Sequence, residues 1–259
     1  MANIINNIVC IGSGNVATHL TSALAKAGKN IVQVYSPNAA HGQTLAKELN
    51  CPYISNINNL QPNADMYLIA ISDDAIESVA KKINTEKGIV VHTSGITDIN
   101  VLNHHKNFGV FYPLQTFSKN VTVNMQDVPF LIEGSSQNTQ QQLIQLAKSI
   151  GNNIHLIDSE KRKKFHLAAV LVNNFPTYLY LQAHEYLKSA NLNFDLLLPL
   201  IRETGNKIKT VNPEKAQTGP ARRKDLNVLE THRRMLSNFP DTLKIYNVIT
   251  QQIVKKYYE

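Results

Sequence analysis

The sequence predicts an α/β protein whose first part forms a mostly parallel sheet and whose second part is all helical. Short β-rich runs alternate with helical patterns up to residue 157, and the strand signal stops from Ser159 onward. The charge changes at the same place. Residues 1–159 carry nine lysines, no arginine and ten acids, whereas residues 160–259 carry all six arginines and a net charge of +8. We therefore expect two domains, residues 1–158 and residues 159–259.

Seven short runs rich in β-branched and aromatic residues are expected to form the strands. They span residues 7–11, 31–35, 66–71, 89–92, 108–112, 129–132 and 153–157. Helical patterns lie between several of them, at residues 15–27, 40–49, 74–83 and 139–150. Unbroken apolar strands of this kind are typical of a parallel sheet covered on both faces. Asp74 is expected to cap its helix, with Glu77 reaching back.

The second part is expected to form helices over residues 159–190, 195–209 and 224–258, with a kink at Pro240. The first of these helices is apolar nearly all round, which is typical of a helix buried on more than one side. No flexible linker separates the two parts. Their junction is therefore a candidate cleft.

Composition excludes several classes of protein. The 259 residues are 43% hydrophobic and 17% charged, which excludes a disordered or fibrous chain. No apolar run approaches the roughly 18 residues of a membrane span, and the N-terminus has no basic leader. Cys10 and Cys51 show no metal-ligand spacing, and no nucleic-acid module is present. We expect a soluble cytoplasmic protein that binds a small molecule and no metal, nucleic acid or membrane.

An apolar strand at residues 8–11 runs into Gly-x-Gly-x-x-Ala at the start of a helix. Gly12 permits a tight turn, and Gly14 lets the backbone approach a pyrophosphate at the helix N-terminus. The motif predicts a Rossmann-like dinucleotide-binding domain, with a purely structural glycine turn as the alternative. The cofactor contacts expected from it are Gly12, Ser13, Gly14, Asn15 and Val16.

The end of the second strand bears on the choice of cofactor. An NAD site usually places an acid there, yet no acid occurs between Gly12 and Glu48. Ser36 and Asn38, and His41 beyond them, are the polar residues that could hold a 2′-phosphate. The sequence therefore favours NADP over NAD.

Two loops follow strand ends, where open α/β sheets bind their ligands. Ile71, Ser72 and Asp73 are expected to contact the cofactor, although Ser72 and Asp73 could equally cap a helix. Ser94 and Gly95 follow the next strand and are expected to contact the substrate.

Two segments of the helical part carry candidate chemistry. Paired asparagines, Asn173 and Asn174, interrupt an apolar helix that begins near His166, and α-helical spacing puts His166 and Asn174 roughly 12 Å apart along the axis. His166 and Asn174 are the candidate catalytic residues; a structural histidine is the alternative. Arg223 and Asp225 lie in a turn where a guanidinium could bind a carboxylate or phosphate, unless the turn is an ordinary helix start.

These segments together resemble the Rossmann-like NADP oxidoreductases of the coenzyme F-420-dependent type, whose C-terminal helical domain has no assigned function. Beside the glycine motif, the matching segments are Asp-Asp-Ala-Ile at 73–76, His-Thr-Ser-Gly at 92–95, Pro-Leu-Gln-Thr-Phe at 113–117, His-x-Ala-Ala with Asn at 166–174, and Thr-Gly-Pro-x-x-Arg-x-Asp at 218–225. The last two are the most specific. The chain is more distantly similar to pyrroline-5-carboxylate reductase, ketopantoate reductase and the β-hydroxyacid dehydrogenases.

The resemblance implies an NADP-dependent oxidoreductase that reduces a C=O or C=N group of a small anionic metabolite, with NAD or a deazaflavin coenzyme as alternatives. It also implies a homodimer, because the helical domains of those enzymes often dimerise. Two departures favour a non-catalytic NAD(P)-binding or sensor protein instead. Val170 stands where β-hydroxyacid dehydrogenases have a lysine, and Tyr112 stands where the family pattern has a histidine.

Overall fold

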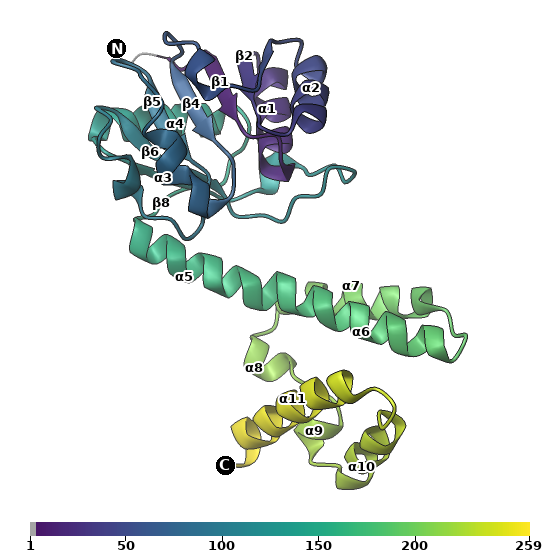
Figure 1. Cartoon of the computed structure of the whole chain (residues 1–259). Helices are drawn as coiled ribbons and strands as arrows, with labels where there is room; N and C mark the ends of the chain where they lie inside the picture. The colour runs from purple at the N-terminus through teal and green to yellow at the C-terminus, as the bar shows by residue number, and fades with distance from the viewer. Residues whose placement is uncertain (1–3) are drawn as a thin grey trace. The chain divides into compact units, whose positions relative to one another are not determined.

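The computed structural model describes residues 4–259, which divide into two compact units, the first ending at Asn173 and the second spanning Asn174–Glu259 (Figure 1). The helix α5 (Ser159–Ala169) packs within the first unit, and the unit boundary falls in the π-helical segment η5 (Val170–Asn174) that follows it. The predicted boundary at residues 158 and 159 lies one helix earlier and stays a prediction.

The first unit is built on a mostly parallel sheet, as predicted. Within the described residues the sheet has eight strands in the order β3-β2-β1-β4-β5-β6-β7-β8, and all pairs are parallel except β6 with β7. The strands are β1 (Asn7–Ile11), β2 (Asn30–Tyr35), β3 (Tyr53–Ile54), β4 (Met66–Ile69), β5 (Ile89–His92), β6 (Phe108–Pro113), β7 (Phe130–Gly134) and β8 (Ile154–Leu156). Only the two-residue strand β3 has no counterpart in the prediction.

Alternate strand residues enter two separate cores, because successive side chains point to opposite faces of a sheet. Ile8 and Cys10 of β1 pack with α1 (Asn15–Lys26), α2 (Ala39–Glu48) and α4 (Gln137–Lys148). Val9 and Ile11 pack with α3 (Ile76–Ala80) and the 3₁₀ helix η3 (Ile99–Leu102) on the other face. Both faces are covered, as the apolar strands predicted.

The second unit is all helical. Its helices are α6 (Phe175–Ser189), α7 (Leu198–Ile208), α8 (Pro213–Ala216), α9 (Pro220–Arg223), α10 (Leu226–Met235) and α11 (Pro240–Tyr258), with the 3₁₀ helix η6 (Phe194–Leu197) before α7. The predicted single helix over residues 224–258 is wrong, because Pro240 cannot continue a preceding helix and instead begins α11. In the described part of the chain, no helix has the length and apolarity needed to cross a bilayer.

Two local predictions fail at helix starts and turns. Asp74 does not cap a helix: it lies inside the 3₁₀ helix η2 (Asp73–Ala75), and Ser72 occupies the N-cap position without a side-chain capping bond. The α-helical spacing assumed between His166 and Asn174 also fails, since η5 is π-helical and its turns are wider.

Candidate functional site

A cavity of about 530 Å³ lies at the carboxyl ends of β1, β4, β5 and β6. The order of strands reverses between β1 and β4, and ligands of open α/β sheets bind at such a switch point. The cavity unites most of the predicted site residues of the first unit. Its lining is Gly12, Ser13, Gly14, Asn15, Val16, Ser36, Pro37, Ala70, Ile71, Ser72, Asp73, Thr93, Ser94, Gly95, Tyr112, Pro113, Gln115 and His166.

The glycine loop forms an open cradle at one end of the cavity. Gly12 has φ +121°, and a Cβ there would lie 2.1 Å from the carbonyl oxygen of Ala70, so the tight turn requires glycine. Gly14 is the N-cap of α1, with no side-chain capping bond, and a Cβ at this position would meet nothing within 4 Å. The first turn of α1 carries no acid. Its unsatisfied N–H groups and the open space beside Gly14 fit a pyrophosphate.

The hydroxyl of Ser36 organises the loop after β2. It lies 2.8 Å from the hydroxyl of Ser13 and accepts a 3.2 Å hydrogen bond from the backbone N–H of Asn38. Asn38 does not line the cavity; its side-chain oxygen accepts a hydrogen bond from the backbone N–H of His41 and caps α2. No carboxylate follows β2, so this loop offers no repulsion to a phosphate.

Asn15 has a contact that the motif did not reveal. Its side-chain amide donates a 2.8 Å hydrogen bond to the carbonyl oxygen of Phe117. The ring of His19, one turn further along α1, lies 3.0 Å from the carbonyl oxygen of Ser118. The segment 113–117 is thereby held against the start of α1, and its residues Pro113 and Gln115 line the cavity.

At the other end of the cavity, two rings from distant parts of the chain meet. The phenol oxygen of Tyr112 lies 3.1 Å from Nδ1 of His166, and the two rings are edge to face. Ser94 is buried, and its hydroxyl accepts hydrogen bonds from the backbone N–H groups of Ile96 and Thr97. Ser94 therefore shapes the loop as well as lining the cavity.

Arg162 fixes α5 to the sheet. Its fully buried guanidinium pairs with Glu133 of β7 at 2.5 Å and donates to the carbonyl oxygen of Thr97. Ser159 completes the cluster by donating a 2.7 Å hydrogen bond to the Glu133 carboxylate. Sequence reasoning missed this cluster, although Arg162 stands out as an arginine 40 residues before the next one, Arg202.

Two rings near this cluster have displaced pKa values. Burial and then the Arg162 guanidinium lower the pKa of His92 to about 3, and its Nδ1 accepts a hydrogen bond from the N–H of Ser94. Burial raises the pKa of Tyr112, and Asp73 raises it further, while Arg162 acts in the opposite direction. At neutral pH His92 is therefore a neutral imidazole and Tyr112 an intact phenol.

The remaining predicted residues belong to the second unit. Asn174 is exposed at the end of η5, and Arg223 is exposed at the end of α9. The Asp225 carboxylate accepts a hydrogen bond from the backbone N–H of Val228 and caps α10. This is the ordinary helix start that the sequence left open as an alternative. The neighbouring Arg222 lies over the ring of Tyr257.

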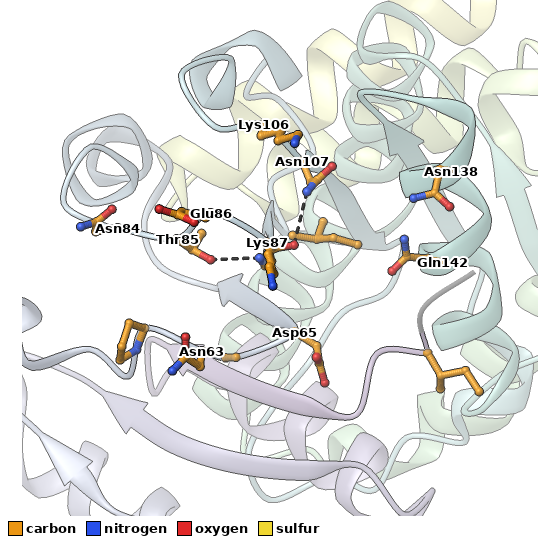
Figure 2. A pocket seen from close by; sticks show the side chains of 15 residues that line it. Asn63, Asp65, Asn84, Thr85, Glu86, Lys87, Lys106, Asn107, Asn138 and Gln142 are labelled. Carbon is orange, nitrogen blue, oxygen red and sulfur yellow. Dashed lines mark hydrogen bonds between the residues drawn. The ribbon is translucent and has the colours of Figure 1, made fainter. Parts of the chain in front are cut away.

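A larger hollow, about 840 Å³, lies at the opposite edge of the sheet, near the amino ends of β4, β5 and β6 (Figure 2). Three of its polar side chains form hydrogen bonds with the backbone. Thr85 accepts a hydrogen bond from the N–H of Gly88, Asn107 donates to the carbonyl oxygen of Lys87, and Asp65 accepts from the N–H groups of Asn6 and Asn7. Ligands of parallel sheets bind at the carboxyl ends, so size does not make this hollow the functional site. Residues 4–259 contain no cluster suited to a metal ion.

Comparison with known proteins agrees with this geometry. Residues 7–94 match the family described as NADP oxidoreductase, coenzyme F-420-dependent, and residues 128–253 match a domain of unknown function, DUF2520. A Bacteroides fragilis protein of known structure, provisionally assigned as an NADP oxidoreductase, is 40% identical over 96% of this chain and 98% of its own, with a TM-score of 0.93. The chain belongs to this family of NADP oxidoreductases.

More distant members of the fold are also similar. A 1-pyrroline-5-carboxylate reductase from Streptococcus pyogenes is 18% identical over 96% of this chain and 98% of its own, with a TM-score of 0.59. An imine reductase from Myxococcus stipitatus, solved with NADP+, is 10% identical over 98% of this chain and all of its own, with a TM-score of 0.65. No curated protein sequence matches significantly. The family resemblance expected from the sequence is confirmed.

Proposed function

We propose that this family member is an NADP-dependent oxidoreductase that reduces a C=O or C=N group of a small anionic metabolite. The observation that carries the proposal is the single cavity that joins the Gly12–Asn15 loop to Ser94, Gly95 and His166. A cavity of this size suits part of a dinucleotide together with a small substrate. When bound, NADPH would supply the hydride.

In this proposal one end of the cavity binds the cofactor and the other end binds the substrate. The glycine loop and the N-terminus of α1 would bind the pyrophosphate, and the loop of Ser36, without a carboxylate, would favour NADP over NAD. His166 would take part in proton delivery beside Ser94 and Gly95. In the same proposal, Asn174 would orient the substrate and Arg223 would bind its anionic group. Asp225 would also contact the substrate. The cytoplasmic location stays a prediction.

Titration of NADPH fluorescence tests the cofactor site directly. Gly14→Asp is a suitable variant, because a side chain there meets no protein atom within 4 Å and Gly14 has φ −78°. Its carboxylate would repel the pyrophosphate, and we expect at least a tenfold loss of NADPH affinity. Gly205→Asp in α7 is the matched control, since it also meets no atom within 4 Å. Absence of NADPH and NADH binding below about millimolar concentration would overturn the proposal.

The helices of the second unit support a proposal about assembly. Large apolar side chains are exposed along α6, η6 and α7, among them Phe175, Leu181, Leu196 and Leu200. Soluble proteins seldom leave such surfaces in contact with water. We propose that a second copy of the chain covers them in a homodimer. Light scattering that gives the mass of a single chain at micromolar concentration would contradict this.

The sensor alternative makes a different prediction. Val170 still stands where related dehydrogenases have a lysine, whereas Tyr112 is hydrogen-bonded to an imidazole. A non-catalytic sensor would bind NADPH, and yet no metabolite pool would oxidise it in the presence of the protein. Oxidation of bound NADPH by any fraction of such a pool would exclude this alternative.

A further inference from the structure

Tyr112 and His166 form a hydrogen-bonded pair at the end of the cavity. Tyr112 stands near the end of β6 and His166 in α5, 54 residues apart in the sequence. Their 3.1 Å contact joins the phenol oxygen to Nδ1, and both side chains line the cavity with Ser94 and Gly95. Tyr112 stands where the family pattern has a histidine. Its phenol is therefore hydrogen-bonded to an imidazole from another element, His166 of α5.

Gly95 provides the space for this imidazole. A Cβ at residue 95 would lie 2.3 Å from Nδ1 of His166 and 2.6 Å from its Cγ. Gly95 does not have a positive φ, so its backbone does not demand glycine. The absence of a side chain at this position therefore serves the His166 ring, which could not take its present position beside any other residue.

His166 also borders a second hollow, of about 510 Å³, outside the cavity. Glu160, Lys163 and Lys164 of α5 and the exposed side chain of Ile96 line it with His166. Leu167 and Val170 complete the lining, so the imidazole lies between the cavity and a solvent-facing hollow of mixed charged and apolar residues. From there it can take up a proton from water and pass one through Nδ1 to the phenol.

The charges around the pair come from α5 and from the segment after β4. Arg162 of α5 and Asp73 after β4 act on the Tyr112 phenol, and Glu160, Lys163 and Lys164 share the second hollow with His166. Burial is the largest influence on Tyr112 and raises its pKa. The phenol therefore stays protonated near neutral pH and can act as a donor.

We propose that Tyr112 is the residue that protonates the substrate and that His166 resupplies it with a proton. This inference rests on the proposed function. The Tyr112 O–H bond would break and its proton would go to the substrate oxygen or nitrogen, whereas bound NADPH would supply the hydride to the adjacent carbon and become NADP+. The Nδ1–H bond of the His166 ring breaks and that proton goes to the phenolate oxygen, while Nε2 takes up a proton from solvent. The ring ends with its proton on Nε2, and exchange with solvent returns the proton to Nδ1.

The test measures tyrosine ionisation in alkaline titrations with and without NADP+. If NADP+ binds with its positively charged nicotinamide ring in the part of the cavity that Tyr112 lines, that charge would stabilise the phenolate, and we expect one tyrosine to ionise about one pH unit lower when NADP+ is bound. Tyr112→Phe should abolish that change and leave NADPH affinity within about twofold. Tyr246→Phe is the matched control: the Tyr246 oxygen lies 3.0 Å from Nδ1 of His232, also edge to face, but in the second unit. It should leave the change intact.

A second readout examines the pair itself without cofactor. The imidazole nitrogen signals of His166, followed by NMR against pH, should move in Tyr112→Phe and stay in place in Tyr246→Phe. Unchanged His166 signals in Tyr112→Phe would overturn the relay. An NADP+-bound protein whose tyrosine titration is the same in wild type and Tyr112→Phe would overturn Tyr112 as donor while the cofactor site stands. Failure of both NADPH and NADP+ to bind would instead defeat the proposed function, and this inference with it.

Discussion

The two units bury their apolar residues to very different degrees. Of the buried hydrophobic residues described, only Ala221, Leu229 and Leu236 belong to the second unit. The first unit has two cores, one on each face of its sheet, and completes them with its own residues. The second unit exposes much of its apolar surface. The difference teaches that the first unit encloses its apolar residues within its own fold, whereas the second leaves many of its large apolar side chains exposed.

One ion pair of the first unit is buried, although others in that unit, such as Lys81 with Glu77, are exposed. Arg162 is fully buried, and its partner Glu133 is mostly buried. The ion pairs of the second unit, such as Lys244 with Asp241 and Lys256 with Glu214, are exposed. Exposed pairs contribute little to stability, while a buried charge depends on its partner. Four substitution experiments sharpen this contrast between the units.

The largest effect is expected for Arg162→Met. It leaves the Glu133 carboxylate without its partner in a mostly buried position and removes the donor to Thr97, so we expect a loss of about 3–5 kcal/mol in the free energy of unfolding. Urea denaturation measures it. The control is Arg234→Met, an exposed arginine of α10, for which we expect a change within about 0.5 kcal/mol. Equal losses of stability in Arg162→Met and Arg234→Met would contradict the difference between the buried and the exposed arginine.

The next largest effect is expected for Gly12→Ala. The new methyl group would lie 2.1 Å from the Ala70 carbonyl oxygen at φ +121°, and we expect a loss of about 2–4 kcal/mol together with loss of NADPH binding. Gly219 in the second unit also has a positive φ, +99°, but a Cβ there meets no atom within 4 Å. Gly219→Ala should therefore cost only about 1 kcal/mol, from backbone strain alone. Thermal unfolding of both variants makes the comparison.

A smaller effect concerns the pH dependence of stability. The pKa of His92 is about 3 in the folded protein and about 6.5 once unfolded, so below pH 6.5 the unfolded chain binds a proton that the folded chain does not. His92 therefore lowers the free energy of unfolding by about 1.4 kcal/mol per pH unit as the pH falls from about 6 to 4. His92→Gln should reduce that slope. A slope that persists would show that carboxylates alone cause it; His155→Gln, at an exposed position, is the control.

The smallest effect is expected at Leu196, which is 79% exposed. Leu196→Ala should change the stability of the separated chain by less than about 0.5 kcal/mol, because the side chain makes few contacts there. In the proposed homodimer it should weaken association, and sedimentation at several protein concentrations would detect this. A large loss of stability that does not depend on concentration would mean that Leu196 is buried within its own chain.

Sequence reasoning worked best where chemistry is local to a few residues. The strand, the glycine motif and the helix at residues 7–26 follow from neighbours along the chain, and Gly12, Ser13, Gly14, Asn15 and Val16 do line one cavity. The parallel sheet and the helical second part were predicted for the same reason, since periodicity and breaker residues are local signals.

The parts that were missed depend on contacts between distant residues. Tyr112 looked like a lost acid or base because nothing along the chain shows that His166 lies 3.1 Å away. The Arg162 cluster was missed because Arg162, Glu133 and Thr97 come from α5, β7 and the loop after β5, which are far apart in the sequence. The hydrogen bond from Asn15 to Phe117 was also missed, because a backbone carbonyl 102 residues away leaves no mark in a motif.

The hydrogen bond from Asn15 to Phe117 has a consequence for how such a site can evolve. The donor is a side chain and the acceptor is a main-chain carbonyl, so any residue at position 117 can accept the bond, whereas few can replace the amide at position 15. The restraint therefore acts on one position only, and substitutions at the two ends need not be correlated. The Tyr112–His166 pair joins two side chains, and a change in one would favour a compensating change in the other. Correlated substitutions across related sequences would thus reveal the Tyr112–His166 pair but not the hydrogen bond from Asn15 to Phe117.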